Sequence, residues 1–84
     1  MMHQTSTTVL RGDLGYVAYR TLGWEGGEPQ LYEFQVSRHS DGMTVATAVG
    51  KTSDEAAKNL SGYLRSAEVW GIVESAVERS EQRA

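Results

Sequence analysis

The chain has 84 residues with a formal net charge of −3, 39% hydrophobic residues, 23% charged residues and no cysteine. A chain of this length forms one small domain that buries only about 60% of its unfolded surface, which leaves little room for a deep internal active site. The eleven acidic and eight basic residues are spread along the chain, and the basic residues form no cluster. This distribution disfavours a protein that binds nucleic-acid phosphates. Without cysteine there is no disulfide, thiolate metal site or cysteine nucleophile.

The N-terminal residues 1–8 are polar, and no part of the sequence approaches the roughly 18 apolar residues of a membrane span. We therefore expect a cytoplasmic protein that does not enter a membrane. Residues 1–84 are predicted to form a single domain, with a flexible tail at 1–6 and a frayed end at 81–84.

Strand patterns occupy the first part of the chain. Aromatic and β-branched residues at Leu14–Leu22, without helical spacing, predict a strand, and a short strand is predicted before it at Thr7–Arg11. The segment Trp24–Pro29 contains a Gly-Gly pair and the only proline, which predicts an exposed connecting loop.

The clearest strand pattern is at Leu31–Arg38, where apolar and polar residues alternate. One face of this strand is predicted to be buried, and it carries Tyr32, Phe34 and Val36. The other face is predicted to be wet, and it carries Glu33, Gln35 and Ser37.

A hairpin turn and a second strand are predicted next. The Asp41-Gly42 pair is a strong hairpin signal, because glycine adopts positive φ without strain. Met43–Val49 is therefore predicted to be the antiparallel partner strand, with Met43, Val45 and Val49 directed inward.

A capped helix is predicted after these strands. Thr52 has the position of an N-cap and Glu55 that of the N3 residue in a capping box, in which side chains satisfy unpaired backbone N–H groups. Apolar residues then recur at helical spacing over about fifteen residues; they are Ala56, Leu60, Tyr63, Leu64 and Ala67. Gly62 weakens this helix, so we expect it to allow close approach of a strand.

The apolar stripe changes phase after Ala67 and continues at Val69, Ile72, Val73, Ala76 and Val77. This change predicts a break near Trp70-Gly71 and a second, shorter helix. The predicted fold is therefore α+β: an antiparallel three- to four-stranded sheet packed on one long helix and followed by a shorter C-terminal helix.

No residue pattern indicates catalysis. His3 and His39 are the only histidines, and His39 lies in a turn, where it can bond Asp41 and where side chains usually serve turn geometry. The serines lie in no nucleophile-elbow motif, and the glycines lack the spacing and the lysine of a phosphate-binding loop. We expect a protein that is not an enzyme and that has no cofactor or metal.

Three glutamates favour a binding function instead. Glu74, Glu78 and Glu81 are spaced so that they share one face of the last helix, where their mutual repulsion would be relieved by a basic partner. The alternative is a solvated helix face whose charge is moderated by Arg79 and Arg83.

Trp24 and Glu25 are the second predicted contact, because a tryptophan in a loop is a common interface anchor. The alternative is that Trp24 folds back over the core. Trp70, at the predicted helix break, is expected in the core or in a homodimer contact. A free edge of the small sheet can also accept a strand from another chain.

Residues 31–67 resemble two families. The strand Tyr32–Val36, the turn Asp41-Gly42 and the run from Gly50 to Asn59 with Thr52 and Glu55 are similar to HicB-type antitoxin domains and to short anti-CRISPR proteins of phages. Both resemblances imply an inhibitor that occupies the surface of another protein. The first expectation is an anti-CRISPR protein that masks a basic surface of a CRISPR effector, and the alternative is an antitoxin that neutralises a small toxin.

The order of strands and helix also resembles double-stranded-RNA-binding domains. In those domains the helix start is rich in lysine and contacts phosphates. Here Asp54 and Glu55 stand at the helix start, with only Lys51 and Lys58 nearby. The sequence therefore argues against direct binding of nucleic acid.

Overall fold

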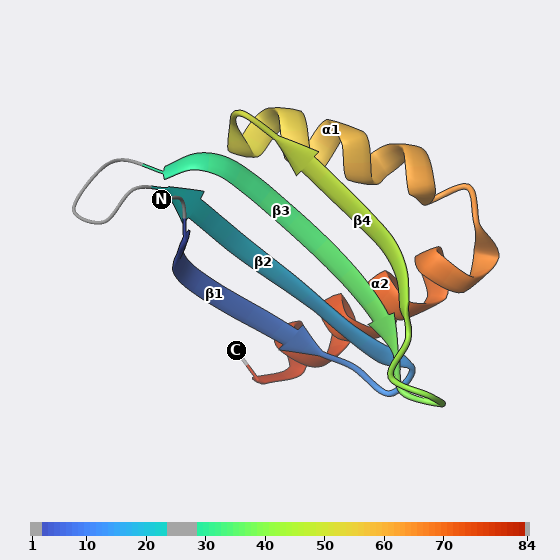
Figure 1. The fold of residues 1–84 in the computed structure, drawn as a ribbon. Coiled ribbons are helices and arrows are strands. Elements are labelled where there is room, and N and C mark those ends of the chain that lie inside the picture. Colours follow the sequence, from blue (N-terminus) through green and yellow to red (C-terminus); the bar gives the residue numbers. More distant parts are fainter. Residues whose placement is uncertain (1–2, 24–28, 84) are drawn as a thin grey trace.

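The computed structural model describes residues 3–23 and 29–83, which form one four-stranded sheet and two helices. In chain order the elements are β1 (His3–Arg11), β2 (Gly15–Gly23), β3 (Pro29–Arg38), β4 (Thr44–Gly50), α1 (Ser53–Tyr63) and α2 (Ala67–Arg83). The sheet is antiparallel with the order β1-β2-β3-β4, so each strand pairs with its neighbour in sequence (Figure 1). The predicted α+β class and the antiparallel sheet are confirmed.

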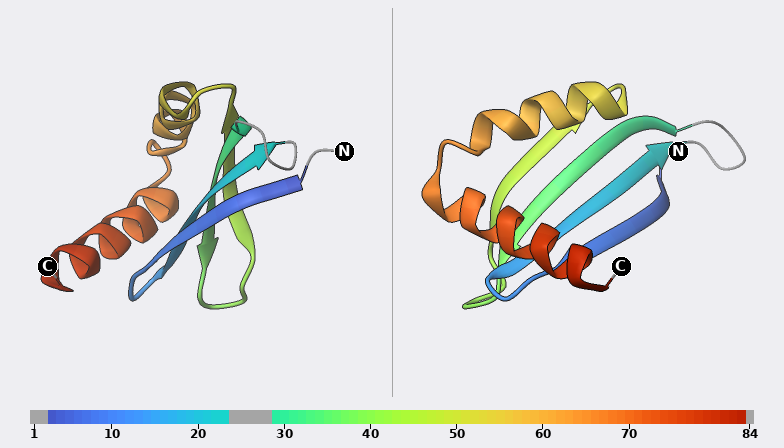
Figure 2. Two further views of the ribbon diagram at one scale, coloured as in Figure 1. Left: turned by 90° about the vertical axis from the view of Figure 1, so that its left-hand side faces the viewer. Right: turned by 180° about the vertical axis from the view of Figure 1, so that it is seen from behind.

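Both helices pack on the same face of the sheet (Figure 2). Helix α1 lies along β4, whereas α2 crosses β1 and β2. The cross-strand row Val17, Val36 and Ala46 forms the centre of the core on the sheet side. On the helix side the core is formed by Val69, Ile72 and Ala76 of α2. Val36 is fully buried and Phe34 packs against this core, as predicted for the inward face of β3. The prediction that Ser37 is wet is wrong, because Ser37 is fully buried between Tyr16 of β2 and Thr44 of β4.

The lengths of the two helices are the reverse of those predicted from the sequence. Helix α1 has 11 residues and α2 has 17. The chain turns at 64–66, where the N–H of Ser66 donates to the carbonyl of Tyr63 at 3.0 Å. Ser66 then begins α2, since its carbonyl accepts from the N–H of Trp70 at 2.9 Å and its hydroxyl accepts from the N–H of Val69 at 3.4 Å. A serine N-cap therefore sets the break four residues before Trp70, and Gly71 is tolerated inside the helix.

The predicted start of α1 is confirmed in its main feature. The hydroxyl of Thr52 accepts a hydrogen bond from the N–H of Glu55 at 3.1 Å, and Thr52 itself has extended backbone angles. Asn59 in the same helix donates to the carbonyl of Val49 at 2.7 Å. Helix α1 is thus held along the edge strand β4.

The inward face of β4 differs from the prediction. Met43 is 57% exposed and Val49 is 40% exposed, and Val45 is only partly buried. The buried residues of β4 are Ala46 and Ala48. Small side chains are required on this face because α1 lies close to the strand, and Ala56 of α1 is fully buried there. An irregular register between Val36 and Ser37 shifts the alternation at the start of β4.

Strand β1 is longer than predicted. It begins at His3, so residues 3–6 belong to the sheet and not to a flexible tail. Ser6 is held there by a 2.9 Å hydrogen bond between its hydroxyl and that of Thr21 in β2. The C-terminal residues 81–83 continue α2. No helix within residues 3–23 and 29–83 has the length and apolar character of a membrane span.

One glycine sets the distance between α2 and the sheet. A methyl group on Gly12, in the turn between β1 and β2, would lie 2.5 Å from the backbone of Ser75 and Ala76. Such a distance is far inside van der Waals contact. The turn and α2 therefore approach each other as backbone on backbone, which a larger residue would prevent.

Gly62 does not serve the close approach that its position in a helix predicted. No atom lies within 4 Å of the place where its Cβ would be, and its backbone has negative φ. We expect the Gly62→Ala substitution to stabilise the protein by up to about 1 kcal/mol, because alanine restricts the unfolded chain. Thermal denaturation would then show a Tm higher by roughly 4–8 °C per kcal/mol. The Gly12→Ala variant is the contrast, with a lower Tm. A Tm of Gly62→Ala below that of the wild type would contradict the open environment of Gly62.

Candidate partner-binding surface

Helix α2 has one face in the core and one face in solvent. Val69, Ile72 and Ala76 are between 0% and 3% exposed. With 3.6 residues per turn, the positions on the opposite side of this helix form a continuous outward surface. We call this surface the α2 outer face, and its exposed residues are Trp70, Glu74, Val77, Glu78 and Glu81.

The three glutamates predicted as partner contacts all lie on the α2 outer face. Among the described residues, no ion pair involves Glu74, Glu78 or Glu81. Arg79, which the sequence offered as a neutralising neighbour, pairs instead with Asp13 at 3.4 Å. The negative charge of the α2 outer face is therefore available to a partner. The other predicted contact, Trp24 and Glu25, lies outside the described residues.

Trp70 does not belong to the core. It is 49% exposed, and Val77, seven residues or about two turns further along α2, is 41% exposed. The expectation of a core tryptophan is wrong because Val69, the preceding residue, takes the inward position, and each residue of a helix is rotated by about 100° from the last. Two large apolar side chains thus stand among the glutamates on the outside of α2.

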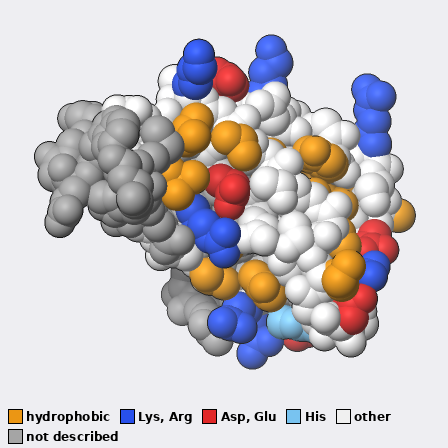
Figure 3. All heavy atoms as spheres, viewed as in Figure 1, with side chains coloured by type: hydrophobic (Ala, Val, Ile, Leu, Met, Phe, Trp, Pro, Cys, Tyr) orange, Lys and Arg blue, Asp and Glu red, His pale blue; other side chains and the backbone are white. Residues whose placement is uncertain are grey.

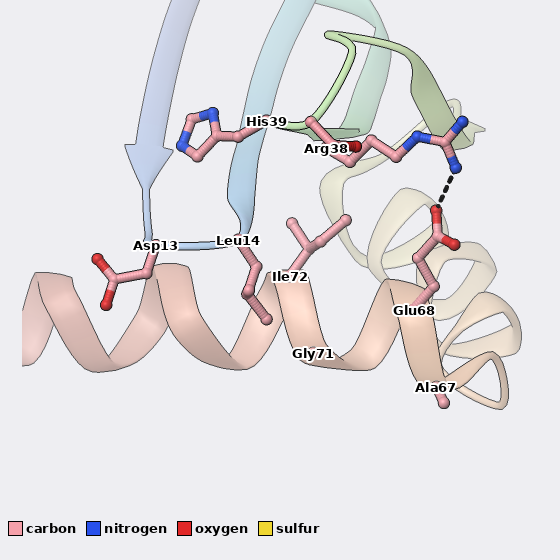
Figure 4. A pocket seen from close by; sticks show the side chains of 9 residues that line it. Asp13, Leu14, Arg38, His39, Ala67, Glu68, Gly71 and Ile72 are labelled. Atoms are coloured by element: carbon pink, nitrogen blue, oxygen red, sulfur yellow. Dashed lines mark hydrogen bonds and ion pairs between the residues drawn. The ribbon is translucent and has the colours of Figure 1, made fainter.

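A hollow of about 470 Å³ adjoins the beginning of α2 (Figure 4). It lies between the β1–β2 turn, the β3–β4 turn and the first two turns of α2. Leu14, Ala67, Gly71 and Ile72 give it an apolar floor. Asp13, Arg38, His39, Ser40 and Glu68 stand around this floor and complete the lining of the hollow.

Arg38 is held in place by two acidic residues. Its guanidinium donates two hydrogen bonds of 2.7 Å to the carboxylate of Asp41 and one of 2.9 Å to Glu68, the latter drawn in Figure 4. The bonds from Arg38, together with one from the N–H of Met43, lower the pKa of Asp41 from its usual 3.8 to about 2. The same bonds raise the pKa of Arg38. The β3–β4 turn is thereby tied to α2, and the charge of Arg38 is neutralised.

His39 also has a structural partner. Its Nε2 lies 2.9 Å from the carbonyl oxygen of Gly12, and its ring is 6.2 Å from that of Tyr16. The expected bond between His39 and Asp41 is absent among the described contacts, because Asp41 accepts from Arg38 and Met43. Within the described residues, no three His, Cys, Asp or Glu side chains are grouped as metal ligands would be.

The face of the sheet opposite the helices has a different character (Figure 3). Arg20 and Glu33 face each other across β2 and β3, and their side chains form an ion pair of 3.2 Å. Gln35 donates to the hydroxyl of Thr44 at 2.7 Å. Acidic and basic side chains are mixed on this face, with uncharged side chains between them. It therefore offers a partner less unbalanced charge than the α2 outer face.

The sequence patterns did not predict that these residues line one hollow. Leu14, His39 and Glu68 come from three turns or element ends that are far apart in the chain. The exposure of Leu14, at 56%, has no signal in the strand pattern that begins there. The serine N-cap at Ser66 was a usable signal for where α2 begins, although it does not indicate which face of α2 is exposed.

Comparisons with protein-family models, with curated proteins and with solved structures found no match to this chain.

The Arg38–Asp41 pair generates a prediction for pH dependence. Because the pKa of Asp41 is depressed in the folded state, its contribution to stability is complete above the usual value of 3.8 and is lost as the pH falls through about 2. We expect the Asp41→Asn variant to have a lower Tm than the wild type at neutral pH, and this difference to shrink between about pH 4 and about pH 2. Thermal denaturation across this range measures it. A Tm difference that stays constant with pH would show that the pair does not stabilise the fold.

Proposed function

We propose that this protein is a non-catalytic inhibitor, which binds a basic surface of a protein or nucleoprotein complex through the α2 outer face and masks that surface. The observation that carries the proposal is the set of three exposed glutamates that form no ion pair with any described side chain, standing beside exposed Trp70 and Val77. An acidic helix face with an aromatic anchor is complementary to a basic surface with an apolar pocket.

The two kinds of residue contribute differently to such a complex. Unpaired carboxylates accelerate association with a basic partner and orient it, but they add little affinity where they stay hydrated. Tryptophan is enriched among the residues that carry most of the binding energy, since it buries a large area with little loss of side-chain freedom. Trp70 is therefore the principal anchor in this proposal, and Glu74, Glu78 and Glu81 set the choice of partner.

The hollow beside α2 enlarges this surface. Its floor of Leu14, Gly71 and Ile72 can receive an apolar side chain. Asp13 at its rim has a side chain that is 90% exposed, and Glu68 is 49% exposed. Because Glu68 and Asp13 already pair with Arg38 and Arg79, the hollow suits an apolar side chain of the partner.

The polar side chains around the hollow favour a binding site over a catalytic site. Arg38 is engaged with two carboxylates, and His39 is bonded to a backbone carbonyl. A general base must lie within hydrogen-bond distance of the substrate proton that it removes. An oxyanion site needs hydrogen-bond donors that are not already bonded to other groups. Arg38 and His39 are instead engaged by Asp41, Glu68 and the carbonyl of Gly12.

The first candidate partner is a CRISPR effector subunit, as the resemblance to anti-CRISPR proteins implies. Such effectors hold nucleic acid in positively charged channels, and an acidic inhibitor competes for these surfaces. A small basic toxin is the alternative, as the resemblance to HicB-type antitoxins implies. In both cases inhibition saturates at a fixed ratio of inhibitor to target, whereas an enzyme would act below that ratio.

The test replaces the three glutamates by glutamine, as Glu74→Gln, Glu78→Gln and Glu81→Gln together. We expect the triple variant to lose inhibition in nucleic-acid cleavage assays of purified CRISPR effectors, or in activity assays of small basic toxins, whichever the wild type inhibits. Its Tm should not fall, because these glutamates repel one another at helical spacing and the last two lie near the negative C-terminal end of α2.

A control variant separates local charge from net charge. Gln30→Lys, Thr47→Lys and Ser61→Lys together change the net charge by the same amount at exposed positions away from α2. This control should inhibit like the wild type at moderate salt. If the glutamine variant inhibits as well as the wild type, the electrostatic proposal is wrong.

The Trp70→Ala variant tests the anchor separately. We expect its affinity for the inhibited partner to fall at least about tenfold, as for a residue at the centre of an interface. Its stability should fall by less than the roughly 3–5 kcal/mol of a buried aromatic residue, since Trp70 is half exposed. Calorimetric titration and thermal denaturation measure the two effects. Met43→Ala, at an apolar residue that is 57% exposed, is the matched control and should keep the wild-type affinity.

A further inference from the structure

The two edge strands of the sheet, β4 and β1, differ in whether a helix lies along them. At one edge, α1 lies along β4, and Asn59 donates to the carbonyl of Val49. At the other edge, β1 is the outermost strand in the described sheet order, with β2 as its neighbour. Figures 1 and 2 show no described strand alongside the outer edge of β1, and the C-terminal end of α2 passes over β1 on one face of the sheet and projects beyond this edge. An edge strand presents a row of backbone groups with the geometry needed to bind another strand.

Strand β1 lacks most of the features that protect such edges. Natural edge strands carry lysine, proline or inward charges, are short, or are distorted by bulges. Residues 4–10 contain neither charge nor proline, and residues 6–11 are all exposed. The irregular register between Gln4 and Ser6 limits the regular part of the strand to Ser6–Arg11. Val9 and Leu10, on opposite faces of this part, are 40% and 38% exposed.

We propose that β1 pairs with β1 of a second copy of this chain, in an antiparallel arrangement centred on Thr8. This register uses the whole regular and uncharged segment. It sets Thr8 opposite its own counterpart, Thr7 opposite Val9, and Ser6 opposite Leu10. Pairs of β-branched and apolar residues of this kind stabilise antiparallel sheets.

Repulsion between the two Arg11 side chains favours the register centred on Thr8 over a register centred closer to Arg11. Arg11 is the first charged residue after the uncharged segment. With Thr8 at the centre, the two Arg11 residues are separated by about 20 Å along the strands, beyond the roughly 8 Å screening length at physiological salt. A register centred on Leu10 would bring them to about 7 Å from each other. A register centred nearer Gln4 would use the irregular part of β1.

The pairing has a geometric consequence. Antiparallel strands in one sheet are related by a two-fold axis perpendicular to the sheet, so paired side chains stay on the same face. The joined sheet would have the order β4-β3-β2-β1-β1-β2-β3-β4. Both copies of α2 would then lie on one side of it, and the two α2 outer faces would belong to the same side of the dimer.

The chain contains no cysteine, which allows a direct test by single-cysteine variants. Five variants carry one cysteine each, at Ser6, Thr7, Thr8, Val9 or Leu10, and are oxidised at equal concentration. Only a residue opposite its own counterpart places two thiols within disulfide distance. We expect the disulfide-linked dimer to be most abundant for Thr8→Cys, by at least about threefold over the other four. Met43→Cys, far from β1, is the control for random collision.

Sedimentation equilibrium of the chain without cysteine gives an independent readout. We expect the wild type to dimerise between about 1 μM and about 500 μM. Val9→Lys should weaken the dimer at least about tenfold, because an edge lysine opposes strand addition, while Met43→Lys should leave it unchanged. The proposal is overturned by a monomer throughout this range, by equal cross-linking at all five positions, or by a dimer that survives Val9→Lys and is lost in Trp70→Ala.

Discussion

The close approach of α2 to the β1–β2 turn is the constraint on which the rest of the structure depends. Gly12 allows the turn to lie against the backbone of Ser75 and Ala76, and Ile72 then reaches the core row of Val17 and Val36. Because this contact fixes the rotation of α2, it also fixes which residues of α2 face solvent. The exposed tryptophan and the line of glutamates are consequences of packing on the opposite side of the same helix.

The same contact creates the hollow beside α2. The β1–β2 turn brings Leu14 over Gly71, and Arg38 ties the β3–β4 turn to Glu68. Arg38 and Arg79, beside the hollow, are engaged in ion pairs, whereas no ion pair between described side chains involves the outer glutamates. An excess of negative charge thus results from how the charges are paired, although the chain as a whole carries only −3. This distribution is what suits the surface to a basic partner.

The core of this protein is built from small side chains. Its buried hydrophobic residues are alanines, valines and one isoleucine, and no aromatic residue with a described side chain is fully buried. Tyr19 and Phe34 instead pack against each other at the partly covered surface of the sheet, with ring centres 4.7 Å apart. A small core of this kind gives limited stability. Large apolar side chains, among them Trp70 and Val77, stand at the surface instead.

Features that depend on local hydrogen bonds and periodicity follow from the amino-acid sequence alone. The cap at Thr52, the alternation of β3 and the hairpin at Asp41-Gly42 all follow from neighbours in the chain. Tertiary packing determines which face of β4 is buried, because the closeness of α1 selects Ala46 and Ala48 over the larger valine and methionine. It also decided the exposure of Trp70 and the assembly of the hollow, since these depend on how α2 is rotated against turns distant in sequence.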